Sequence, residues 1–148
     1  MREIKFRGYN KECNKWVYWY LVKRDKDWII VTDAKAVNNR IASVEFYVVD
    51  EKSIWQYTWL KDKNWREIYE GDIVKIINKN WSSPAYGVGC LVVISYFCRK
   101  WWTYCWFWYA GWLSLTYNKA KWLEIVGNIY ENPKLLKDNK INNENRNG

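Results

Sequence analysis

Apolar and polar residues alternate with a period of two along most of this chain, and this pattern restricts its fold more than any other feature. No window of a dozen residues shows the i, i+3, i+4, i+7 spacing of an amphipathic helix. Many short strands separated by turn signals are typical of an all-β barrel or sandwich. The strands predicted in this way lie at residues 3–9, 15–22, 27–33, 43–50, 72–77, 89–97, 113–117 and 123–130.

The 148 residues divide into a β domain over residues 1–136 and a polar tail over residues 137–148. The tail has one apolar side chain, Ile141, so it cannot offset the entropy lost on ordering, and we expect it to be disordered. Within the domain, the turn signal NKECNK predicts that the first two strands pair as a hairpin. The segment KNWSSPAYG predicts a long loop at residues 79–87.

Histidine is absent, which excludes catalysis by a histidine base and most zinc sites. The chain opens with the charged run MREIKFR, which does not resemble a secretory signal. Reduced thiols, a cytoplasmic location and no bound metal or cofactor are therefore expected. The four cysteines form no C-x-x-C pair: Cys13, Cys90, Cys98 and Cys105.

The longest uncharged stretch covers residues 101–118 and approaches the length of a membrane span. Polar residues such as Thr103 and Ser114 interrupt it, and its many Trp and Tyr residues favour a membrane interface over the hydrocarbon centre. We therefore predict a buried β meander here and no membrane partner.

The chain has 24 Lys and Arg against 16 Asp and Glu, and no acidic residue occurs between Asp72 and Glu124. A basic segment rich in aromatic residues suits single-stranded nucleic acid, because cations neutralise phosphates and bases stack on aromatic rings. The competing interpretation is that the aromatic residues are strand core and the charges are solvated. The candidate nucleic-acid contacts are Lys75, Lys79, Arg99, Lys100, Lys119 and Lys121.

Carboxylates near one turn suggest a different chemistry. Glu70 and Asp72 flank Gly71 and can face one way on an extended chain, with Glu67 nearby, an arrangement suited to Mg²⁺ in a nuclease. The competing interpretation is a structural turn, in which Gly71 adopts an unusual φ and Asp72 bonds to the backbone. No phosphate-binding, hydrolase or zinc-protease motif occurs, and we predict no catalytic residue and no enzymatic activity.

Three long segments carry a resemblance: MREIKFRGYNKECNKWVY, IWQYTWLKDKNWREIYEGDIVKI and LEIVGNIYENPKLL. Together they resemble the YopX family of small phage and prophage proteins. The resemblance implies an SH3-like, partly open barrel with additional N-terminal hairpin strands. It implies no assigned activity and no catalytic residues. The motif residues expected to be structural are Gly71, Asp72, Gly127, Asn128, Asn132 and Pro133.

Tryptophan outnumbers glycine by 13 to 7, although tryptophan is normally scarce. YopX-like sequences have glycine at some of these positions, and a glycine after Asn64 would complete a type I′ hairpin turn. Tryptophan makes the positive φ of such a turn costly. We predict opal codons that the host reads as glycine, foremost at Trp55, Trp59 and Trp65, and next at Trp19, Trp28, Trp81, Trp106, Trp108, Trp112 and Trp122.

The competing interpretation is a true tryptophan-rich variant with rebuilt turns. With glycine, most of the aromatic surface for nucleic acid would disappear. The function predicted from the sequence is that of a non-enzymatic phage or prophage accessory protein, which binds a protein or nucleic-acid partner. A homo-oligomer is also expected, since exposed sheet edges tend to associate. The alternatives are a single-stranded nucleic-acid binder using residues 75–121 and a Mg²⁺-dependent nuclease.

Overall fold

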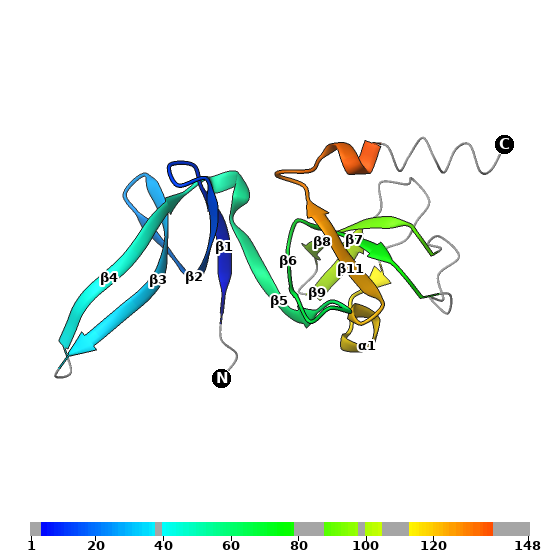
Figure 1. Cartoon of the computed structure of the whole chain (residues 1–148), viewed down its shortest axis with the longest axis horizontal. Helices are drawn as coiled ribbons and strands as arrows, with labels where there is room; N and C mark the ends of the chain where they lie inside the picture. Colours follow the sequence, from blue (N-terminus) through cyan, green and yellow to red (C-terminus); the bar gives the residue numbers. More distant parts are fainter. Residues whose placement is uncertain (1–3, 38–39, 79–87, 98–99, 105–112, 138–148) are drawn as a thin grey trace. The chain divides into compact units, whose positions relative to one another are not determined.

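The computed structural model describes residues 4–37, 40–78, 88–97, 100–104 and 113–137 and is predominantly β, as the alternation predicts (Figure 1). Its strands form two antiparallel sheets, with orders β4-β3-β2-β1-β5-β6 and β10-β9-β8-β7-β11. Neither order closes into a barrel within the described residues. The chain divides into two compact units, Met1–Tyr57 and Thr58–Gly148, and β5 continues from the first into the second.

The first unit is a series of antiparallel hairpins. Asn10 pairs with Lys15, which confirms the hairpin predicted around NKECNK. The β2 strand then leaves β1 and pairs with β3, with Tyr20 opposite Val31. The elements are β1 (Phe6–Asn10), β2 (Lys15–Arg24), β3 (Asp27–Val37), β4 (Arg40–Val49), the 3-10 turn η1 (Glu51–Ser53) and the start of β5 (Trp55–Lys61).

The core of the first unit contains one buried residue from each of three strands. Val17, Ile30 and Val49 come from β2, β3 and β4 and are nearly inaccessible. Because successive side chains of a strand point to opposite faces, the neighbours of these residues on β2 and β4 project outward. Partly buried residues surround the cluster: Leu21, Trp28, Tyr47 and Ile54.

The second unit is organised around strand β7, which lies between β8 and β11. Ile68 of β6 packs into the same core as Val74, Ile94 and Leu123, and all four are fully buried. The elements are β6 (Glu67–Tyr69), β7 (Asp72–Ile76), β8 (Leu91–Phe97), β9 (Lys100–Tyr104), β10 (Leu113–Ser114), α1 (Tyr117–Ala120) and β11 (Leu123–Asn128).

The segment predicted as one strand at residues 113–117 is divided. Strand β10 ends at Ser114, and Thr116 begins the helix α1, whose N–H groups of Lys119 and Ala120 donate to the Thr116 carbonyl oxygen. Ala120 is 1% exposed, so packing of the helix against the core outweighs the local strand pattern. The predicted loop at 79–87, the middle of the predicted meander and the tail from 138 lie outside the described residues. Within the described part, no helix is long and apolar enough to cross a membrane.

A basic pocket as the candidate functional site

The carboxylate of Asp62 organises the loop between β5 and β6. Its Oδ1 accepts the backbone N–H groups of Asn64 and Arg66 at 2.8 and 3.0 Å. Its Oδ2 accepts the N–H of Ile125 at 3.1 Å and the Arg66 guanidinium at 3.1 and 2.9 Å. The side chain of Asp62 is fully buried, and it ties the loop to strand β11.

These contacts determine the charge of Asp62. Burial by itself raises the pKa of this carboxyl group, since weakly polar surroundings disfavour the ion. The N–H groups of Ile125, Arg66 and Asn64 and the Arg66 guanidinium outweigh burial and hold the pKa of Asp62 below its ordinary value of 3.8. Asp62 is therefore ionised at neutral pH and paired with Arg66.

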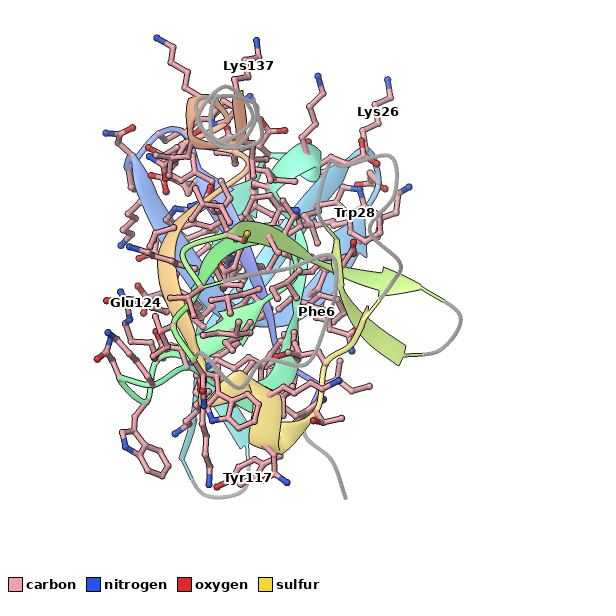
Figure 2. All side chains as sticks on the ribbon, turned by 90° about the vertical axis from the view of Figure 1, so that its right-hand side faces the viewer. Phe6, Lys26, Trp28, Tyr117, Glu124 and Lys137 are labelled. Carbon is pink, nitrogen blue, oxygen red and sulfur yellow. The ribbon has the colours of Figure 1, made fainter. Side chains whose placement is uncertain are left out.

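A pocket of about 210 Å³ lies beside this loop and is lined by Lys61, Asp62, Lys63, Trp65, Tyr117 and Lys121. The ammonium of Lys121 lies 4.4 Å from the ring centroid of Tyr117. Tyr117 is 58% exposed, and its side chain projects away from α1 in Figure 2. The pocket thus combines an accessible aromatic ring with a cation beside it.

The pocket is positively charged because two of its charged residues are paired. Asp62 is paired with Arg66, and the ammonium of Lys63 lies 3.0 Å from the carboxylate of Glu124 on β11. The sign of the pocket is therefore set by the two remaining lysines of its wall, which are both exposed: Lys61 and Lys121.

Residues 5–137, which are most of the chain, match the protein family described as "YopX protein". This chain belongs to the YopX family. Among solved structures, it is similar to protein EF1440 from Enterococcus faecalis, with a TM-score of 0.53 and 24% identity over 90% of this chain and 97% of that chain. At this identity the similarity shows a shared fold. No curated protein matches the sequence.

The YopX fold brings only part of the predicted nucleic-acid surface into the pocket. Lys121 lines the pocket, and Lys119 precedes it by two residues in α1. Lys75 is exposed on β7, opposite Glu124 of β11, and does not line the pocket. The side chains of the other three predicted contacts lie outside the described residues: Lys79, Arg99 and Lys100.

The sequence does not single out the lysines that accompany Lys121. Lys61 and Lys63 precede the acid-free segment, and Asp62 between them cancels one charge when the chain is read linearly. In the fold, Arg66 neutralises Asp62, so that cancellation does not apply. Lys61 and Lys63 lie next to a predicted turn, and this pattern is the signal from which the site could have been predicted.

The segment that holds Glu67, Glu70 and Asp72 has the geometry of the structural turn. Asp72 is 1% exposed, and its Oδ2 accepts the backbone N–H of Tyr69 at 2.8 Å. The Tyr69 hydroxyl donates to Glu67 at 2.7 Å, and Gly71 has a φ of 75°. Within the described residues, no group of three or more His, Cys, Asp or Glu side chains is placed to hold a metal ion.

The closing YopX motif forms a hydrogen-bonded turn after β11. The Oδ1 of Asn128 accepts the backbone N–H groups two and three residues later, at 3.0 and 2.9 Å. The Oδ1 of Asn132 accepts the N–H of Asn128 at 3.2 Å. A Cβ at Gly127 would lie 2.5 Å from that Asn132 oxygen, so any other residue there would displace the Asn132 side chain. Pro133 leads into a helical turn at residues 134–137.

Three tryptophans have a backbone conformation that suits glycine. The φ angles of Trp19, Trp59 and Trp65 are 116°, 68° and 64°. The other described non-glycine residues of positive φ are Asn14 and Asp25, types that enter this region more easily. The structure therefore has a positive φ at position 65, where the sequence predicts one.

Trp55 and Trp28 differ from these three, because neither has a positive φ. Trp55 is 6% exposed and stacks on Trp16, with ring centroids 5.3 Å apart, and the Arg7 guanidinium lies against both rings. The indole N–H of Trp28 donates to Glu51 at 3.3 Å. The backbone thus gives no reason for glycine at either position. The remaining candidates are Trp122, which packs partly buried on the second core, and four outside the described residues: Trp81, Trp106, Trp108 and Trp112.

Proposed function

We propose that this YopX-family protein is a non-enzymatic accessory protein of a phage or prophage that binds single-stranded nucleic acid in the cytoplasm of a bacterial host. The observation that carries the proposal is the basic pocket, where Lys61 and Lys121 lie beside the exposed ring of Tyr117. We further propose that the strands of the second unit correspond to an SH3-like, partly open barrel. The turn at Gly71 and Asp72, which opens β7, supports this assignment.

The chemistry of the pocket suits a nucleotide unit. Lysine ammonium groups neutralise backbone phosphates without reading sequence, and aromatic rings stack on any base. The pocket volume of about 210 Å³ is below the roughly 300–1,000 Å³ of sites for drug-sized ligands. A single base and its phosphate fit this description better than a large cofactor does.

Binding of a fluorescent thymidine oligonucleotide should weaken moderately as the salt concentration rises. Two lysine–phosphate contacts on a single strand predict a slope of about −1.4 in log K against log salt concentration. The double variant Lys61→Ala/Lys121→Ala should bring this slope close to zero, since no counterions would be released at the pocket. Fluorescence anisotropy at several salt concentrations measures both slopes.

Matched variants distinguish binding at the pocket from binding through general surface charge. Lys134→Ala removes an exposed lysine of the same unit that does not line the pocket, and it should leave the affinity unchanged. Tyr117→Ala should weaken binding by about 5–150-fold through lost stacking, whereas Tyr117→Phe should retain it. Absence of binding at low salt, or equal losses in Lys134→Ala and the double variant, would contradict the proposal.

The first unit supports a second proposal, association with another copy of the chain. Apolar side chains form two uncharged rows across β2, β3 and β4, next to the sheet edge formed by β4. The outer members of the rows, on β2 and β4, are exposed, whereas the central Val31 is half-buried and the central Ile29 is buried. In a chain of net charge +8, such rows let two copies meet without opposing like charges. The rows, defined by strand register, are Tyr20–Val31–Phe46 and Val22–Ile29–Val48.

Sedimentation velocity at rising concentration tests this association. The unaltered chain should approach the mass of a dimer, and Phe46→Ser should remain a monomer because it replaces the exposed apolar end of a row, on the edge strand β4, with a polar group. Tyr117→Ser removes an exposed aromatic ring in the second unit and should still form dimers. A monomeric unaltered chain at every concentration would show that another molecule, or none, covers the rows.

A further inference from the structure

We propose that positions 19, 59 and 65 are glycine in the protein as its own host makes it. This inference rests on backbone geometry and is independent of the proposed nucleic-acid binding. A residue with a Cβ clashes with its own backbone at positive φ, and glycine does not. A bulky side chain at such an angle is a rare outlier in proteins, and the described part of this chain has three of them of one residue type.

The local structure at position 65 requires a residue of positive φ. The N–H of Trp65 donates to the Asp62 carbonyl oxygen at 3.0 Å, and the N–H of Asp62 donates to the Arg66 carbonyl oxygen at 2.9 Å. These two bonds define a three-residue hairpin loop, a turn followed by one left-handed residue, in which glycine is preferred. Asn64 is not among the residues of positive φ, so this loop replaces the type I′ turn that the sequence suggests.

Position 19 lies where strand β2 changes its partner. Trp19 is the last residue of β2 paired with β1, opposite Phe6, and Tyr20 is the first paired with β3. A φ of 116° at this point bends the strand, and glycine within strands typically marks such bends. Position 59 lies within β5 after Thr58, whose hydroxyl bonds to the Ile68 carbonyl oxygen at 2.7 Å.

At position 65 the side chain gains little that would offset the strain, since Trp65 is 72% exposed. Trp19 is 37% exposed, and the Lys5 ammonium lies 4.6 Å from its ring. Trp16 and Trp55, by contrast, pack on each other and on Arg7 and have no positive φ. The backbone angle thus separates positions 19, 59 and 65 from positions 16 and 55. An opal codon read as glycine accounts for the first group only.

Glycine at position 65 would also change the basic pocket. Trp65 lines that pocket together with Tyr117. Without the indole the pocket is wider, and Tyr117 is its remaining aromatic wall. Residue 65 thereby determines how large a ring the pocket can accept.

The gene itself provides the first test. We expect UGA codons at positions 19, 59 and 65 and a UGG codon at position 16. Because UGG is read as tryptophan whether or not UGA is reassigned, UGG at any of the three positions would overturn the proposal there. Peptide mass spectrometry of the protein from its own host should find glycine across residues 54–76 at positions 59 and 65, and tryptophan at both would overturn it.

Paired variants of the tryptophan-containing chain test the backbone argument separately. At positions 19, 59 and 65, the glycine variant should melt above the alanine variant, because alanine retains the Cβ that causes the clash. The rise in Tm over the tryptophan form should be on the order of 2–10 °C for each glycine. At position 16 the order should reverse, since glycine weakens an ordinary strand. An alanine variant as stable as the glycine variant at all three positions would overturn the proposal.

Discussion

Replacing Asp62 by alanine is expected to lower the free energy of unfolding by about 3 kcal/mol, because the change leaves three backbone N–H groups without their acceptor. The carboxylate accepts from Asn64, Arg66 and Ile125 and is fully buried. Urea denaturation at neutral pH measures the loss. Glu12→Ala removes an exposed carboxylate and should change stability by less than about 0.5 kcal/mol.

The effect of Asp62 should also depend on pH. Its pKa in the folded protein lies below the ordinary 3.8, so its contribution is complete above that value and is lost as pH falls through the folded pKa. The stability difference between the unaltered chain and Asp62→Asn should therefore be large at pH 7 and shrink under strongly acidic conditions. A difference that stays constant down to acidic pH would mean that the charge of Asp62 contributes nothing.

Replacing Trp55 by glycine is expected to destabilise the tryptophan-containing chain by about 3–5 kcal/mol, in contrast to the stabilisation expected for Trp65→Gly. Trp55 is 6% exposed, stacks on Trp16 and lies over the Arg7 guanidinium. Its removal leaves a cavity and takes away one of the two rings beside that cation. Thermal unfolding should show a lower Tm for Trp55→Gly and a higher Tm for Trp65→Gly than for the unaltered chain.

Trp55 is the position where sequence and structure disagree most about glycine. The resemblance to YopX sequences places glycine there, whereas the structure gives the indole a packed site and an ordinary backbone. Unchanged or raised stability in Trp55→Gly would return this residue to the group formed by positions 19, 59 and 65. The expected loss would instead mark it as a packing residue of this chain.

The turn near Asn64 is predictable from the local sequence, but the type of turn is not. The sequence predicts a turn there, and a turn is present, because residues between two strand-like runs have few alternatives. The local sequence suggests a type I′ turn, whereas the structure has a three-residue hairpin loop. The Asp62 carboxylate bonds to Ile125, which is 63 residues away in sequence, and that contact favours the three-residue loop.

Strand content and the antiparallel hairpins follow from the sequence alone, since alternation and turn residues act between neighbours in the chain. The buried Asp72 and the capping Asn128 were also predictable, because each bonds to backbone only a few residues away. The basic pocket was not, since it joins Lys61 to Lys121 across 60 residues, and its sign depends on which acids the fold pairs. Tertiary structure alone determines which distant charges meet and which tryptophans pack, because both depend on contacts that no local pattern encodes.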